Sequence, residues 1–163
     1  MKTVSIKFLE DNRACYSAKE WFESLQKDRY SVRYLARVLF KKNRFDWINW
    51  GIVRMMNKKQ KVMYAIFAAE QVIKIYEEKY PDDNRPRLAI EAAKKYLKNP
   101  SKKTKAADAA YADAAADAAA YAAAYAYAGA DADTAAYAAY AAAAAKIKLQ
   151  KKIINYGLKL IKK

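Results

Sequence analysis

The stretch Ala106–Ala145, AADAAYADAAADAAAYAAAYAYAGADADTAAYAAYAAAAA, decides which folds this sequence can adopt. Alanine fills 27 of its 40 positions, and the rest are six tyrosines, five aspartates, Gly129 and Thr134. Alanine has the highest helix propensity because its side chain loses no entropy on folding. The proline, serine and glutamine that keep chains disordered are absent from it. We therefore expect closely packed helices here, forming a scaffold and not a site of chemistry.

The alanine-rich stretch is too long for one straight helix. Forty residues would extend about 60 Å, whereas a compact chain of this length is roughly 40 Å across. We expect a break at 129–134, where Gly129 can end one helix and Asp133 or Thr134 can cap the next. The second helix should then continue to the C-terminus. A pentapeptide-repeat β-solenoid is the alternative, but no leucine or phenylalanine recurs at every fifth position.

The apolar residues outside this stretch recur at helical spacing. They predict helices over 12–27, 31–40, 45–56, 59–79 and 86–98, after a short strand or extended lead-in at residues 1–10. The predicted fold class is all-α: a bundle of about seven helices with a long alanine-rich helical hairpin. We expect one domain over 1–163, in which 1–100 carry the motifs, 101–145 form the hairpin and 146–163 a basic amphipathic helix.

The net charge of +15 is unevenly distributed. Residues 1–105 carry a balance of +13, residues 106–145 carry −5, and residues 146–163 hold seven lysines and no acid. Such a field attracts anions, which include a nucleotide, nucleic acid, an acidic protein and an anionic membrane. Solubility alone explains the charge equally well. The C-terminal helix could likewise bind an anionic surface or pack on its own bundle.

Residue types missing from the chain exclude many kinds of site. The chain has no histidine and one cysteine, Cys15, so it lacks a Ser-His triad and a thiolate zinc site. Cys15 is expected to be a small buried hydrophobe. No Gly-rich phosphate loop or membrane-spanning apolar run occurs, and we expect no secretory signal. We expect a non-enzymatic, cytoplasmic protein without a cofactor or metal, although a carboxylate-based hydrolase using Glu77, Glu78, Asp82 and Asp83 remains formally possible.

An aromatic and basic cluster opens the helix predicted over 45–56. Asp46 can cap this helix, and Trp47 and Trp50 share one face because they are three residues apart. Lys42 and Arg44 precede them. Core packing is one interpretation of the tryptophans. The other is an aromatic platform for a base or a peptide, flanked by cations.

Residues 9–98 resemble the immunity-five-like protein family, whose members lie beside bacterial toxin genes and in phage genomes. The resemblance rests on Ala14-Cys15 followed by Trp21, on Asp46-Trp47 with Trp50, and most specifically on the segment PDDNRPRLAIEAAK at 81–94. Members commonly continue into alanine-rich helices, as this chain does. Where members often have an arginine and a glycine, this chain has Lys94 and Asn99.

The resemblance implies an all-α, non-enzymatic protein that neutralises a target. The motif residues that carry over are Cys15, Trp21, Asp46, Trp47, Asp82, Arg85, Pro86 and Arg87. Arg85 and Arg87 either pair with Asp82, Asp83 or Glu77, or bind an anion at a helix N-terminus.

Three functions follow from the sequence. The first is sequestration of an anionic ligand, such as a nucleotide immune signal, by a phage or bacterial counter-defence protein. Its candidate ligand-binding residues are Arg85, Arg87, Trp47, Trp50, Trp21, Asp46, Asp82, Lys42 and Arg44. The second is inhibition of an acidic toxin or defence effector, and the third is nucleic-acid binding. The alanine-rich helices could also form a homo-oligomer.

Overall fold

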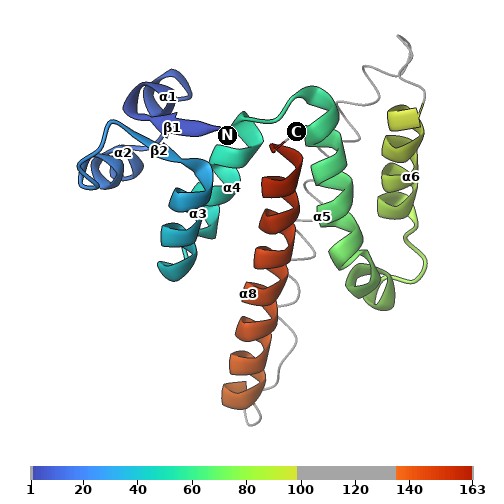
Figure 1. Cartoon of the computed structure of the whole chain (residues 1–163). Helices are drawn as coiled ribbons and strands as arrows, with labels where there is room; N and C mark the ends of the chain where they lie inside the picture. Colours follow the sequence, from blue (N-terminus) through green and yellow to red (C-terminus); the bar gives the residue numbers. More distant parts are fainter. Residues whose placement is uncertain (1, 99–134, 163) are drawn as a thin grey trace. The chain divides into compact units, whose positions relative to one another are not determined.

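The computed structural model describes residues 2–98 and 135–162, with only the backbone at residues 79 and 135–145. These residues form an all-α fold of seven helices with one two-stranded antiparallel sheet (Figure 1). The chain divides into two compact units: unit 1 is Met1–Met56 with Ile154–Lys163, and unit 2 is Asn57–Ile153. The predicted single domain remains a prediction. The break expected at 129–134 and the packing of the alanine side chains lie outside the described residues.

Unit 1 begins with two short strands, each followed directly by a helix. Val4 of the first strand pairs with Tyr30 of the second. Ser5 and Ser31 end the strands and cap the following helices, because their hydroxyls accept bonds from the backbone N–H of Phe8 and Tyr34, both at 3.2 Å. The elements are β1 (Thr3–Ser5), α1 (Ile6–Asp11), α2 (Tyr16–Glu23), β2 (Arg29–Ser31), α3 (Val32–Lys41) and α4 (Phe45–Arg54).

The N-terminal third differs from the prediction in three ways. Residues 6–10, which were expected to belong to a strand or an extended lead-in, lie in α1. The helix expected over 12–27 is shorter, since α2 spans Tyr16–Glu23 and Gln26 has a φ of 65°, which no helix accommodates. Cys15 therefore precedes α2 and is exposed, so its expected burial on an apolar stripe is wrong. The short interval between the helices predicted over 12–27 and 31–40 contains most of β2.

α3 and α4 supply much of the core of unit 1. α3 buries one face, with Leu35 and Leu39 at 6% and 5% exposure, and its opposite face carries basic residues. Ile52 of α4 is 1% exposed. The core residues of unit 1 are Val4, Leu9, Phe22, Tyr30, Val32, Leu35, Ala36, Leu39, Phe45, Ile48, Ile52, Met56, Ile154, Leu160 and Ile161.

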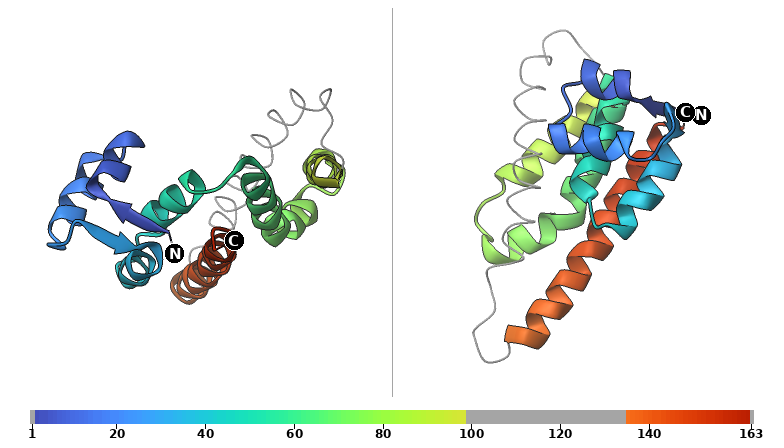
Figure 2. Two further views of the ribbon diagram at one scale, coloured as in Figure 1. Left: turned by 45° about the horizontal axis from the view of Figure 1, so that its top comes forward. Right: turned by 90° about the vertical axis from the view of Figure 1, so that its left-hand side faces the viewer.

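Unit 2 contains α5 (Lys58–Lys79), α6 (Arg85–Lys98) and the first part of α8 (Ala135–Leu160). A capping box begins α5: the Asn57 side chain accepts from the Gln60 N–H, and the Gln60 side chain accepts from the Asn57 N–H. Pro86 lies in the first turn of α6, where its missing N–H costs nothing. As expected, one helix leads from the end of the alanine-rich stretch toward the C-terminus (Figure 2).

α5 and α6 pack through one apolar cluster, formed by Val62, Ile66, Ala69, Ile73, Ile90 and Ala93, with Tyr96 and Leu97 against it. Leu88, near the start of α6, is 53% exposed. At 100° per residue, Leu88 lies about 140° around the helix from Ala93, so it cannot share that face. No helix in the part of the chain that the structure describes meets the length and hydropathy needed to cross a membrane.

Candidate functional site

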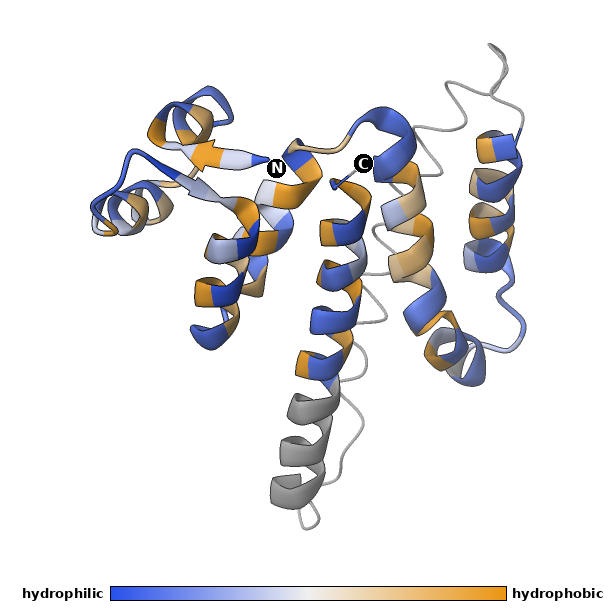
Figure 3. Ribbon diagram, in the orientation of Figure 1, coloured by the Kyte–Doolittle hydropathy of each residue, from blue (hydrophilic) through white to orange (hydrophobic). Residues whose placement is uncertain are grey.

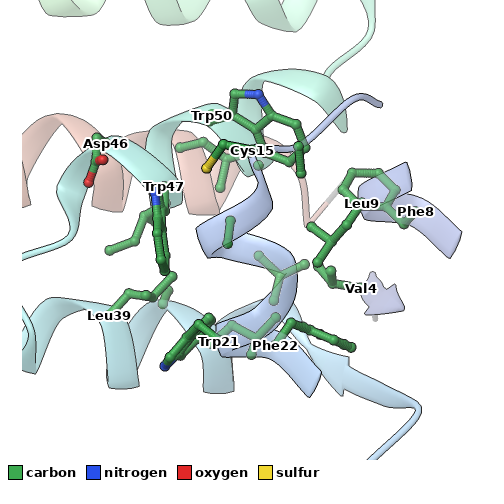
Figure 4. Close-up of a pocket in the computed structure, with 18 of the residues that line it drawn as sticks. Val4, Phe8, Leu9, Cys15, Trp21, Phe22, Leu39, Asp46, Trp47 and Trp50 are labelled. Carbon is green, nitrogen blue, oxygen red and sulfur yellow. The ribbon is translucent and has the colours of Figure 1, made fainter. Parts of the chain in front are cut away.

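A pocket of about 400 Å³ lies within unit 1 (Figure 4). Val4, Phe8 and Leu9 come from β1 and α1, Ala18, Trp21 and Phe22 from α2, and further apolar side chains from α3 and α4. The polar lining residues are Arg13, Cys15 and Asp46. An apolar pocket with a few polar groups is typical of a small-molecule site.

All three tryptophans of the chain line this pocket. The rings of Trp21 and Trp47 lie 5.7 Å apart between centroids, and Trp50 meets Phe8 edge to face at 6.4 Å. Aromatic pairs at these distances add about 0.5–1.5 kcal/mol beyond the area they bury. The pocket therefore has aromatic walls whose side chains pack on one another.

Two arginines lie over the tryptophan rings. The guanidinium carbon of Arg44 is 3.5 Å from the ring centroid of Trp47, and that of Arg54 is 4.0 Å from the ring centroid of Trp50. Arg44 also donates to both carboxylate oxygens of Asp46, at 3.0 and 2.8 Å, and thereby lowers the pKa of Asp46. The expected helix cap at Asp46 is replaced by this pair, since Asp46 lies in the first turn of α4 and Arg44 at its N-cap.

A second group of charged residues joins α5 to the start of α6. Asp83 accepts a bond from the Tyr76 hydroxyl at 2.7 Å and two from the Arg85 guanidinium at 2.8 and 2.7 Å. The Arg85 bonds, followed by that of Tyr76, hold the pKa of Asp83 well below its ordinary value. Asp83 also accepts the backbone N–H of Arg85 at 3.1 Å, which fixes the entry into α6.

Arg87 and Glu77 pair across the same junction, with two guanidinium nitrogens donating to the two carboxylate oxygens. This pair lowers the pKa of Glu77 and raises that of Arg87. About two turns away from this pair on both helices, Lys94 pairs with Glu70 at 2.6 Å. These ion pairs match the structural alternative that the sequence left open for Arg85 and Arg87, although both side chains remain at least half exposed.

The candidate residues fall in both units. Trp21, Asp46, Trp47 and Trp50 line the pocket of unit 1, and Arg44 contacts Trp47. Lys42 is exposed at the C-cap of α3 and is absent from the pocket lining. Arg85, Arg87 and the exposed Asp82 belong to unit 2. The structure thus brings the three tryptophans together in one pocket. Arg85 and Arg87 belong to a separate group of residues in unit 2.

The sequence did not identify several of the residues that line the pocket. Phe8 was assigned to an extended lead-in, and Arg13 to a continuous helix, although Arg13 has a φ of 55°. Gly51 lines the pocket from the middle of α4, where an alanine would favour the helix more. Glycine in a helix interior is unfavourable relative to alanine, so Gly51 was a sequence signal that could have marked this position.

Comparison with protein families matches residues 51–162 to the family described as "Imm-5 like putative immunity protein". This range includes the PDDNRPRLAIEAAK segment and begins after Cys15, Trp21, Asp46 and Trp47, on which the resemblance also relied. Comparison with curated proteins gave no match, and comparison with solved structures gave none.

Proposed function

Because this chain belongs to the Imm-5 like immunity protein family, we propose that it neutralises its target by binding, without catalysis, and that it sequesters a small anionic ligand with an aromatic base. A nucleotide immune signal has this chemistry. The ligand would be held in the cytoplasm of a bacterium or of a phage-infected host.

The observation that carries this proposal is the pocket lined by all three tryptophans. Its volume of about 400 Å³ lies within the 300–1,000 Å³ typical of small-molecule sites. Stacking of a base on an aromatic side chain contributes about 1–3 kcal/mol. Trp47 and Trp50 already carry guanidinium groups on their rings, so the walls combine stacking surface with positive charge.

The charges around the pocket favour an anion. Arg13 lines it, Arg54 stacks on Trp50, and neither arginine has an ion pair among the described residues. Asp46 is the one carboxylate in the lining, and Arg44 neutralises it. A phosphate beside Arg13 or Arg54 would therefore meet an uncompensated guanidinium, which suits bidentate recognition.

The second candidate is inhibition of an acidic toxin or defence effector through a protein interface. Large apolar side chains on the surface favour it: Tyr16 is 71% exposed, Tyr34 44%, Leu88 53% and Ile75 41%. Tyrosine is enriched at such interfaces. In this candidate Arg87 would hold α6 on α5 through Glu77, and Arg85 would fix the loop before α6 through Asp83.

Calorimetry against a panel of cyclic and linear nucleotides separates the two candidates. We expect one nucleotide to bind with one-to-one stoichiometry, and Trp47→Ala to weaken it about 5–150-fold, which corresponds to the stacking energy. Arg85→Ala/Arg87→Ala measures whether the arginine pair adds to the affinity. Absence of binding by every nucleotide, together with a stable complex with a co-expressed effector that Tyr16→Ala or Leu88→Ala disrupts, would replace the first candidate by the second.

A further inference from the structure

A second hollow of unit 1, of about 650 Å³, is a strongly basic groove and shares only Ala36 with the tryptophan pocket. We call it the α3–α8 groove. Its cations are Arg33, Arg37 and Lys41 on α3, Lys159 on α8, and Lys162 just beyond. Its other lining residues are Ala36, Phe40, Asn155 and Leu158, so no carboxylate lines it. Figure 3 shows the same mixture of hydrophilic and hydrophobic residues along α3 and the last turns of α8.

The groove cations are among the basic residues that have no carboxylate partner in the described part of the chain. Arg44, Arg85, Arg87 and Lys94 each form an ion pair. None of the five groove cations forms one among residues 2–98 and 146–162, and all five are exposed. Their mutual repulsion is therefore uncompensated within the described part of the protein.

Helix stabilisation explains only part of this charge. Lys41 and Lys159 lie in the last turns of α3 and α8, where cations interact favourably with the helix dipole. Arg33 is the second residue of α3, where the dipole disfavours a cation. Arg37 repels Arg33 and Lys41, each one turn away. A surface that keeps unfavourable charges in one row is suited to an external anion.

The spacing of the row identifies the kind of anion. Arg33, Arg37 and Lys41 succeed one another every four residues, which is about 6 Å along the helix, and the row is about 12 Å long. The phosphates of a single nucleotide cannot extend along this row, whereas neighbouring phosphates of an extended strand can. Phe40 and Leu158 give the groove apolar surface for a base. Basic grooves with an aromatic side chain bind single strands in this way.

We propose that the α3–α8 groove binds the phosphodiester backbone of single-stranded nucleic acid, a function beyond ligand sequestration in the tryptophan pocket. The salt dependence of binding then reports how many cations engage. At about 0.7 per neutralised phosphate, contact with all five gives a slope of log affinity against log salt of about −3.5.

Fluorescence anisotropy with a labelled 15-residue oligothymidine, titrated at several salt concentrations, tests the proposal on the full chain. We expect Arg33→Gln/Arg37→Gln/Lys41→Gln to weaken binding and bring the slope to about −1.4, since two contacts remain. The matched control, Lys7→Gln/Lys19→Gln/Lys27→Gln, removes the same net charge from unit 1 outside the groove. The control should retain the slope of the wild type.

Both variants change solvent-accessible side chains without ion pairs, so their circular dichroism spectra should match the wild type. A groove variant that folds and keeps the wild-type slope would overturn the proposal, as would an equal loss in the control. Absence of binding to oligothymidine, or tighter binding to a duplex or to inorganic polyphosphate of similar charge, would also overturn it.

Discussion

Replacing Gly51 by alanine is expected to stabilise the protein. Gly51 is an interior residue of α4, and its φ lies outside the left-handed region. A Cβ built on Gly51 would meet no atom within 4 Å. The substitution therefore removes the entropic cost of glycine without creating a clash, and we expect a gain of about 0.5–1 kcal/mol.

Thermal unfolding followed by circular dichroism measures this gain. For a chain of this size, 1 kcal/mol shifts Tm by roughly 2–4 °C, so Gly51→Ala should raise Tm by about 1–4 °C. Urea unfolding should show a higher midpoint with an unchanged slope, because the exposed surface is the same. A lower Tm would refute the reasoning, since it would mean that the space beside Gly51 is filled.

Gly51→Leu extends the same test to ligand binding. Since Gly51 lines the tryptophan pocket and its Cβ direction is open, a leucine here should enter the pocket volume with little loss of stability. We expect ligand affinity to fall at least tenfold in Gly51→Leu and to change little in Gly51→Ala. Equal affinities in the two variants would place the ligand elsewhere.

Three further predictions concern unit 2. Ile90→Ala should cost about 2–5 kcal/mol in urea unfolding, because Ile90 is 5% exposed in the cluster that joins α5 to α6. Asn57→Ala should lower the free energy of unfolding by about 0.5–2 kcal/mol, because it removes one half of the capping box of α5. Asp83→Asn should lower Tm at pH 7, and its difference from the wild type should shrink as the pH falls below about 3.8. The pKa of Asp83 is depressed in the folded protein, so its contribution is present above the ordinary value of 3.8 and is lost as pH falls through the folded value.

Each of these predictions has an outcome that contradicts it. A cost below about 1 kcal/mol for Ile90→Ala would mean that α6 does not depend on this cluster. Unchanged stability in Asn57→Ala would show that water can replace the Asn57 side chain as the hydrogen-bond acceptor for the first turn of α5. A difference between Asp83→Asn and the wild type that stays constant down to pH 2 would show that the Arg85 and Tyr76 bonds do not stabilise the fold.

The sequence predicted α3, α4, α5 and α6 closely because their apolar residues recur at helical spacing and caps or loops separate them. Ser31 supplied the cap of α3, and Pro86 marked the start of α6. β1 lies within residues 1–10, where a short strand or an extended lead-in was expected. β2 and its pairing with β1 were missed, since three residues are too few for a period-two pattern to show. α2 was overextended because Arg13 and Gln26 have positive φ values that spacing cannot reveal.

The candidate site was predicted only in part. The three tryptophans were identified by residue type, but the pocket is also lined by Phe8 of α1, by Gly51 of α4 and by Arg13, which lies between α1 and α2. Glu77 was one of the carboxylates predicted as a partner of Arg87, because oppositely charged residues flank a single short loop. The basic groove could not be foreseen, because it joins α3 to residues more than 100 positions later in the chain.

Intrinsic tryptophan fluorescence tests the central claim most directly, because all three tryptophans of the protein line the proposed ligand pocket. Titration of the wild type with the nucleotide identified by calorimetry should give a saturable change in fluorescence whose midpoint equals the calorimetric Kd. The same titration of Gly51→Leu should require at least tenfold more ligand. Calorimetric binding without any change in tryptophan fluorescence, or an unshifted midpoint in Gly51→Leu, would contradict sequestration in this pocket.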